Sequence, residues 1–220
     1  MNSDFPSFPS LVNFISQIDS GLPASEFEMA ETLMFHQTLT FYMDIVSVIQ
    51  DLLPGYETIR ILDVGSRTGA GANLMGFVFS ENSYSRIKAE VTALDIEDRF
   101  QKYSITKFPW IKEYVVDDIF NVSSSWDIVV CSHTIEHVYN YTEFINEMRS
   151  KTKRYLIVLA PYDEANCKLI KDIPMCEGHI NSITHDSIAS FSPIIFKIYR
   201  SLVWHQSLAF LAVIPGTAAY

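Results

Sequence analysis

The first 59 residues of this 220-residue chain contain no lysine or arginine. Eight acidic side chains give this segment a charge of −8, and the remaining residues carry only −2 of the net charge of −10. Binding to nucleic acid normally requires a basic face that displaces counterions, and no cluster of lysine and arginine supplies one. We therefore expect no nucleic-acid partner. We interpret the acidic segment as a solvated face in preference to a surface that steers a cationic substrate.

Long apolar runs and frequent cysteines are also absent. The longest apolar stretches, such as 208–215, fall well short of the ~18 residues that a membrane span needs. A signal peptide needs an early basic region, whereas the first basic residue is Arg60. The three cysteines, an odd and sparse set, fit reduced thiols better than a disulfide framework. These features predict a cytoplasmic protein without a membrane partner.

The composition that is present favours one α/β domain with a full core, because 48% of the residues are hydrophobic and 13% are aromatic. Ser25 and Glu28 form a capping box that opens a long amphipathic helix, which Pro54 and Gly55 end. We therefore divide the chain into a helical segment, 1–54, and a main domain, 55–220.

A short apolar run, typical of a buried parallel strand, leads into a glycine-rich turn after Val64. Glycine permits positive φ and a close approach of the backbone to a nucleotide-like ligand. A dinucleotide fingerprint would need glycine at positions 65, 67 and 70, but Arg67 and Ala70 occupy two of these. The turn therefore argues against a nicotinamide or flavin dinucleotide.

The sequence L-D-V-G-S-R-T-G-A-G, residues 62–71, resembles the first motif of class I S-adenosylmethionine (SAM)-dependent methyltransferases. In that motif an acidic residue and a glycine-rich turn follow the first strand. Arg67 replaces the usual middle glycine, so either this position tolerates a Cβ or the loop has shifted. The resemblance implies SAM as cofactor and S-adenosylhomocysteine (SAH) as product. It also implies cofactor contacts from Asp63, Gly65, Ser66 and Gly69.

Two further strands end in acidic residues. Asp95 follows the second strand, where an acid can accept hydrogen bonds from both ribose hydroxyls. The family carries its ribose-binding acid in this place. Ile96, the next residue, is therefore also a cofactor-binding candidate. After the third strand, Asp118 and Ile119 resemble the family's segment that touches adenine. The resemblance implies that Asp118 accepts the exocyclic amino hydrogen and that the next residues cover the ring.

A fourth apolar strand, 126–131, leads into S-H-T-I-E-H, which resembles the family's fourth motif. Residues of that motif lie beside the methionine part of SAM and face the acceptor. Ser132 is therefore a further cofactor-binding candidate. His133 and His137 are the candidate acid/base residues, because histidine exchanges protons near neutral pH.

The same histidines allow a different interpretation, since H-T-I-E-H from His133 to His137 also fits the H-x-x-E-H pattern of inverted zinc peptidases. In those enzymes two histidines hold zinc within a helix, whereas here the motif directly follows a strand. Cys176 and His179 lack a second suitably spaced pair. We therefore predict no metal site.

The C-terminal part of the chain completes the pattern. Gly178 and His179 open a loop similar to a Gly-His-Val loop that borders the acceptor site in many small-molecule methyltransferases; bracing of the loop and catalysis are both open roles for His179. Apolar segments 194–203 and 208–214 predict an antiparallel hairpin. The resemblance covers residues 55–216. It implies an α/β, Rossmann-like three-layer sandwich with a seven-stranded, mostly parallel sheet, an antiparallel last strand and additional N-terminal helices.

The resemblance implies an enzyme that transfers the methyl group of SAM to a hydroxyl or amine of a small-molecule acceptor. We expect residues 1–54 to form a lid over the cleft. A SAM-binding protein without catalysis is the second interpretation, and Arg67 in the glycine turn is its best support.

Overall fold

The computed structural model describes residues 24–164, 178–200 and 208–218. The chain divides into two units, 1–38 and 39–220, so that the boundary lies within helix α2 (Ala24–Leu52). The predicted long helix is confirmed, but it begins at Ala24, so the predicted cap Ser25 lies within it. Its second half belongs to the same unit as the sheet, whereas the sequence analysis placed the boundary after residue 54.

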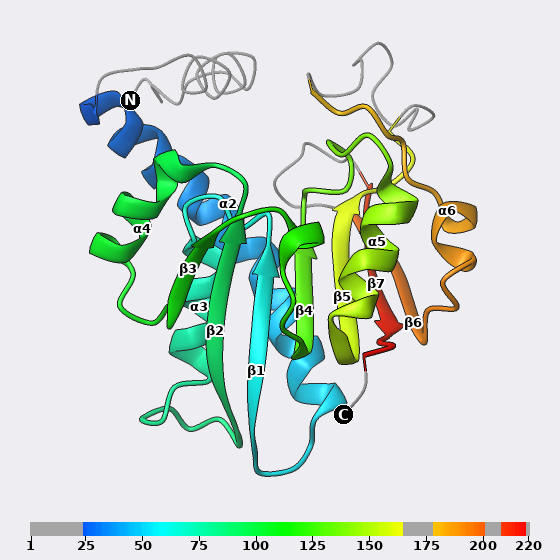
Figure 1. Ribbon diagram of the computed structural model, residues 1–220, viewed down its shortest axis with the longest axis horizontal. Coiled ribbons are helices and arrows are strands. Elements are labelled where there is room, and N and C mark those ends of the chain that lie inside the picture. The colour runs from blue at the N-terminus through cyan, green and yellow to red at the C-terminus, as the bar shows by residue number, and fades with distance from the viewer. Residues whose placement is uncertain (1–23, 165–177, 201–207, 219–220) are drawn as a thin grey trace, which may run out of the picture. The chain divides into compact units, whose positions relative to one another are not determined.

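The second unit is built around a seven-stranded sheet with the order β3-β2-β1-β4-β5-β7-β6 (Figure 1). The strands β1 to β5 pair in parallel, and β7 runs antiparallel to both of its neighbours, β5 and β6. This arrangement confirms the predicted fold class. The strands are β1 (Glu57–Val64), β2 (Ile87–Asp95), β3 (Glu113–Val116), β4 (Trp126–Ser132), β5 (Thr152–Pro161), β6 (Ile195–Arg200) and β7 (Leu208–Pro215).

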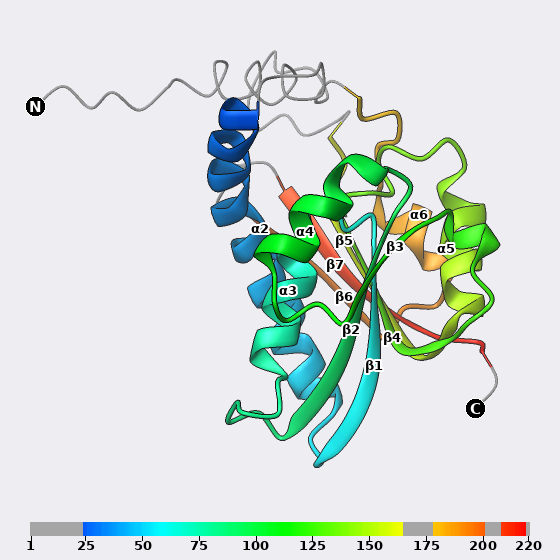
Figure 2. The same cartoon turned by 60° about the vertical axis from the view of Figure 1, so that its left-hand side comes forward.

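Helices cover both faces of the sheet, as Figure 2 shows, with α3, α4 and the second half of α2 on one face and α5 and α6 on the other. The helices are α3 (Ala70–Val78), α4 (Gln101–Lys107), α5 (Tyr141–Ser150) and α6 (His185–Ala189), with short 3-10 helices at Asp98–Phe100 (η1) and Ile119–Asn121 (η2).

Successive side chains of β1 point to opposite faces of the sheet. Leu62 and Val64 are buried in one core cluster with Ile145 and Met148 of α5. Asp63 lies between them in sequence and therefore points to the opposite face, towards α2. The first strand thus buries side chains on both faces, as a central parallel strand requires.

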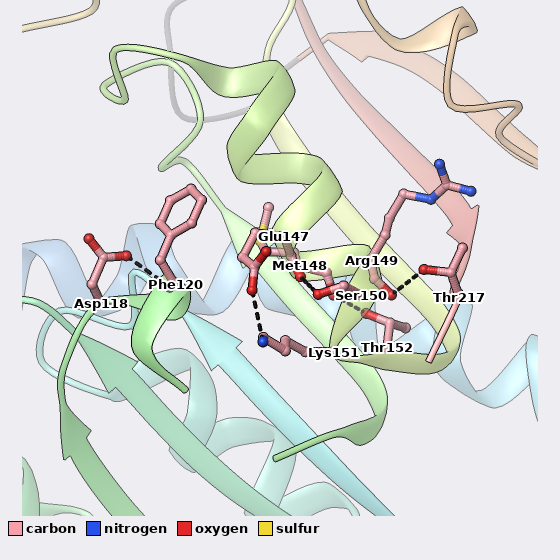
Figure 3. Close-up of polar contacts among 9 residues, drawn as sticks. All are labelled: Asp118, Phe120, Glu147, Met148, Arg149, Ser150, Lys151, Thr152 and Thr217. Atoms are coloured by element: carbon pink, nitrogen blue, oxygen red, sulfur yellow. Dashed lines mark hydrogen bonds and ion pairs between the residues drawn. The ribbon is translucent and has the colours of Figure 1, made fainter. Parts of the chain in front are cut away.

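The C-terminal end of α5 is closed by local hydrogen bonds, which Figure 3 shows. The hydroxyl of Thr152 donates to the carbonyl of Met148 at 2.7 Å, and the hydroxyl of Thr217 donates to the carbonyl of Arg149 at 3.2 Å. The last carbonyls of a helix lack partners within the helix. These bonds satisfy two of them and fasten the end of the described chain to α5.

Candidate active site

The buried carboxylate of Asp63 anchors the glycine turn that follows β1. Tyr42 of α2 donates to Oδ1 and Ser66 donates to Oδ2, both at 2.6 Å. The backbone N–H of Ala72, in the first turn of α3, acts to lower the pKa of this carboxylate. Burial raises the pKa of Asp63 to about 6. The side chains predicted to contact the cofactor, Asp63 and Ser66, thus brace the turn.

The turn itself places three residues in the left-handed region of backbone conformation. Gly65 has φ 71°, Arg67 has φ 48° and Gly69, the N-cap of α3, has φ 83°. A Cβ added to Gly65 would lie 2.2 Å from Oγ1 of Thr134, which follows β4. Glycine is therefore required at position 65 both for its φ and for the close approach of the fourth-strand segment.

Arg67 keeps the turn in place although it carries a Cβ. Its backbone N–H donates to Oδ2 of Asp95 at 2.7 Å, and the hydroxyl of Tyr114 donates to its carbonyl. Its guanidinium lies 5.4 Å from the ring centroid of Phe100. The left-handed conformation is thus supported through both the backbone and the side chain, and the position tolerates a Cβ in this chain.

Asp95 lies at the carboxyl end of β2, where the resemblance implies the ribose. Its carboxylate accepts one bond from Arg67 and one, at 3.0 Å, from the N–H of Glu97. A carboxylate has about four acceptor sites. Asp95 can therefore hold the glycine turn and still accept a ribose hydroxyl, which makes it compatible with the implied cofactor.

The carboxyl ends of β2 and β3 present a carboxylate flanked by apolar side chains. Asp118 is exposed, and its carboxylate accepts the N–H of Phe120 at 3.2 Å (Figure 3). Ile96 and Phe120 are 72% and 45% exposed, whereas Ile119 belongs to the core cluster. A hydrogen-bond acceptor at the same edge of the sheet as exposed apolar side chains suits an adenine ring. Phe120 rather than Ile119 presents its side chain here.

His133 packs closely at the end of β4. Its ring stacks on Phe41 with centroids 3.8 Å apart, and its Nδ1 lies 3.1 Å from Oγ of Ser132. Its Nε2 is buried without a hydrogen-bond partner among the residues that the structure describes. Burial, with the nearby His179 and His137, lowers the pKa of His133 to about 3. An imidazole with this pKa is a weak base at neutral pH.

His137 is exposed and faces the loop before α6 rather than His133. Its Nδ1 lies 3.0 Å from the carbonyl oxygen of Gly178, and its ring meets that of His179 edge to face with centroids 4.6 Å apart. Glu136, between the two predicted histidine positions, is only 1% exposed, and burial raises its pKa to about 7. In the sequence this glutamate was considered only within the H-x-x-E-H pattern.

Three other residues at the site were not recognised as site residues from the sequence. Tyr42 binds Asp63, and Phe41 stacks on His133, as described above. Oε2 of Glu164 lies 2.5 Å from Nδ1 of His179. The periodicity of the long helix marks Phe41 as an apolar position, but no local pattern indicates the partner of any of these side chains.

A family profile described as "Methyltransferase domain" matches residues 34–191 of the chain. The chain belongs to this methyltransferase domain family. The matched range contains the glycine turn, Asp95, Asp118 and the segment that follows β4. No curated protein matches the sequence of this methyltransferase.

Solved structures show the same fold at low sequence identity. Magnesium protoporphyrin IX methyltransferase from Synechocystis PCC 6803 with bound SAH superimposes with a TM-score of 0.64 at 14% identity, covering 92% of this chain and 93% of that one. The plantazolicin methyltransferase BpumL, in complex with a triazolic substrate analogue and SAH, gives 0.62 at 11% identity, with 95% and 98% covered. Coclaurine N-methyltransferase, bound to N-methylheliamine and SAH, gives 0.54 at 11% identity, with 72% and 51% covered.

The methyltransferase uses SAM as its methyl donor and releases SAH. The residues present at the carboxyl edge of the sheet fit this group, since Asp95 retains acceptor capacity and Asp118 lies near exposed apolar side chains. Within the described part of the chain, no helix has the length and apolar content needed to span a bilayer.

Proposed function

We propose that this methyltransferase transfers the methyl group of SAM to a hydroxyl or amine of a small-molecule acceptor. One observation carries the proposal. The side chain of Thr134 packs against Gly65 of the cofactor turn, and its carbonyl accepts the N–H of His137 at 2.9 Å. A single turn thus connects the cofactor-binding region to an exposed imidazole.

Methyl transfer from SAM requires few reactive side chains. When bound, SAM supplies an electrophilic methyl group on a sulfonium. Most of the rate enhancement then comes from holding the acceptor in line with that methyl group in a water-poor site. A hydroxyl must lose its proton, and an amine must be neutral when it reacts. His137, exposed and oriented through Nδ1, is the candidate base, and His133 is a neutral wall of the site.

The acceptor class is supported by charge and by the neighbours. The net charge of −10 and the absence of a basic cluster disfavour nucleic acid. The three structures above are of a magnesium protoporphyrin IX methyltransferase, an enzyme bound to N-methylheliamine and an enzyme bound to a triazolic desmethylPZN analogue, and these compounds are small and chemically diverse. We extend only the small-molecule class to this chain, and retain a cytoplasmic location as a prediction.

An acceptor screen tests the proposal. Purified protein is incubated with SAM and a library of hydroxyl- and amine-bearing compounds, and SAH formation is measured. With an accepted compound, His137→Ala should lower kcat by about 10²- to 10⁴-fold, the usual contribution of a general base. His185→Ala, which changes a histidine that is 58% exposed, should leave kcat unchanged. Tight SAH binding without turnover of any compound would instead support the non-catalytic interpretation.

A further inference from the structure

Two loops meet beyond the carboxyl end of β4 and are fastened by four hydrogen bonds. The backbone N–H groups of Ile180 and Asn181 both donate to the carbonyl of Glu136, at 2.8 and 3.1 Å. The side-chain amide of Asn181 donates to the carbonyls of Ile135 and Val138, at 3.1 and 2.6 Å. The side chains at this junction are therefore held in a fixed relation.

The junction brings together one carboxylate and two imidazoles. Glu136, His137 and His179 each offer a ligand atom, and these atoms all lie within 4.8 Å of one another. In a tetrahedral zinc site with bonds of ~2.0–2.2 Å, ligand atoms are about 3.3–3.6 Å apart. Small side-chain rotations are therefore sufficient to close the three groups around an ion.

Each imidazole already has the partner that a metal-ligating histidine normally has. Nδ1 of His137 lies 3.0 Å from the carbonyl oxygen of Gly178, and Nδ1 of His179 lies 2.5 Å from the Glu164 carboxylate. Metal-bound histidines almost always donate their second ring N–H to a carbonyl or carboxylate, which fixes the tautomer. With Nδ1 of each ring beside an oxygen, Nε2 would be the ligating nitrogen in such a site.

The carboxylate of Glu136 supplies a second, independent observation. It is 1% exposed, and neither oxygen has a hydrogen-bond partner among the residues that the structure describes. A buried carboxylate is strongly disfavoured unless a cation or hydrogen-bond donors compensate for its lost hydration. The adjacent His137 is exposed, which gives an ion a route from solvent.

We infer that Glu136, His137 and His179 bind a divalent first-row transition metal ion, with zinc as the best fit to two imidazoles and one carboxylate. Imidazole favours zinc and its neighbours over magnesium or calcium. Three protein ligands leave one coordination position open, as in catalytic rather than structural zinc sites.

This ligand set differs from the histidine pair considered in the sequence analysis, on which the prediction of no metal site was based. That pair joined His133 to His137 within the H-x-x-E-H pattern, in which Glu136 was not a ligand. In the structure, His133 stacks on Phe41, and Glu136 is placed as a ligand beside His179. The inferred site is therefore not that of an inverted zinc peptidase.

A role for the ion rests on the proposed function. The open position suits an oxygen of the acceptor, so that the ion favours a hydroxyl over an amine and lowers its pKa. Because His137 then ligates the ion, it no longer acts as the base, and the hydroxyl releases its proton to solvent. Its oxygen lone pair forms the bond to the methyl carbon, and the electron pair of the broken carbon–sulfur bond returns to sulfur, giving SAH.

Metal binding can be measured without SAM or an acceptor. Full-length protein, stripped with a chelator, is titrated with Zn²⁺ against a chromophoric competitor, and with Co²⁺ for its visible absorption. We expect about one ion per chain. Glu136→Gln, His137→Ala and His179→Ala should abolish binding at micromolar metal. Glu164→Gln, which alters only the orienting carboxylate, should weaken binding about 10- to 100-fold.

The control variants distinguish the two histidine sets. His133→Ala and His185→Ala should bind the ion as the wild type does. Because His137 is exposed, its substitution should leave the fold intact, which far-ultraviolet circular dichroism checks. Absence of a bound ion in the wild type, or loss of binding in His133→Ala, would overturn the site.

The role in catalysis has a separate readout. Metal-free protein should bind SAH with unchanged affinity but lose turnover of an identified acceptor, and added Zn²⁺ should restore it. Full turnover by metal-free protein would overturn the role of the ion. If no acceptor is converted by either form, the proposed function fails, whereas the metal titration still decides the site.

Discussion

At the scale of single residues, the bond from Tyr42 to the buried Asp63 makes stability depend on pH. The folded-state pKa of Asp63 is raised to about 6, so the protonated side chain is favoured in the folded protein. Protonated Asp63 stabilises the folded protein fully below the ordinary carboxyl pKa of ~4. This stabilisation is lost as the pH rises through the folded-state pKa of about 6. The bond from Tyr42 opposes this loss because it stabilises the ionised carboxylate.

Tyr42→Phe should therefore cost more stability when Asp63 is ionised. We expect a loss of about 1.5–3 kcal/mol at about pH 8, where the bond is charge-assisted, and about 1 kcal/mol at about pH 5, where it is neutral. Urea unfolding at both pH values measures this difference. Tyr56→Phe, at a side chain that is 85% exposed, is the matched control. An equal loss at both pH values would contradict the assignment.

Gly71 is required by packing rather than by its backbone conformation. It lies within α3, and a Cβ added there would be 2.1 Å from Cζ of Tyr42. In an open helix, glycine to alanine stabilises by about 1 kcal/mol. Here Gly71→Ala should destabilise by about 1–3 kcal/mol, because the ring that binds Asp63 must move. Gly55→Ala, with nothing within 4 Å of the added Cβ, should lie within about 0.5 kcal/mol of the wild type in urea unfolding. Stabilisation by Gly71→Ala would contradict the clash.

At the scale of elements, Asn181 holds the loop before α6 against the turn that follows β4. Asn181→Ala removes two side-chain hydrogen bonds and should cost about 1–3 kcal/mol. It should also speed hydrogen exchange at the backbone amides of residues 180 and 181, which donate to the carbonyl oxygen of Glu136. Asn140→Ala removes the N-cap of α5 at a cost of about 1 kcal/mol, but should leave those two amides protected. Unchanged exchange in Asn181→Ala would show that the loop is held by other contacts.

Most elements of the sheet were predictable because buried parallel strands are short apolar runs with clear ends. The predicted strands that end before Asp95 and Asp118, the strand at 126–131 and the C-terminal hairpin are all confirmed. Helix α4 was not predicted, since its seven residues are too few to show a convincing periodicity. The positions of Asp95 and Asp118 at one edge follow from chain order alone, because parallel strands place their carboxyl ends together.

The contacts within the site were less predictable because they join segments far apart in the chain. Nothing near Asp63 indicates that Tyr42 will reach it, and nothing near Glu136 indicates that His179 will lie beside it. Local sequence describes neighbours along the chain, whereas these pairs depend on how helices and loops dock on the sheet. The exposure of Phe120 in place of the predicted Ile119 has a similar cause. The 3-10 helix η2 determines which of these two side chains faces the core.

At the scale of the whole molecule, the chain divides into two units between residues 38 and 39. The predicted lid, residues 1–54, spans this division. Residues 1–20 lie outside the described part, so the lid stays a prediction from the sequence. Their deletion should leave SAH affinity unchanged and lower turnover of an identified acceptor, because a lid excludes water from the cleft. Intact turnover after the deletion would contradict the lid.

The acidic N-terminal segment leads to an expectation about the charge of the acceptor. Eight acids without a basic residue should favour neutral or cationic acceptors over phosphorylated ones, although salt screens exposed charges within about 8 Å. Comparison of kcat/KM for matched neutral and phosphorylated acceptors measures the effect. A strong preference for the phosphorylated compound would contradict it.

The central claim is that SAM binds across the carboxyl ends of β1, β2 and β3, with Asp95 on the ribose. Calorimetric titration of SAH tests it most directly, with wild type, Asp95→Ala and Glu97→Ala measured side by side. Glu97 is a neighbouring exposed carboxylate paired with Arg99, so its removal should leave affinity unchanged. Asp95→Ala should weaken SAH binding by at least about tenfold, since each lost charge-assisted bond is worth roughly 1.5–3 kcal/mol. Equal affinity of Asp95→Ala and wild type would contradict the placement of the cofactor at this edge.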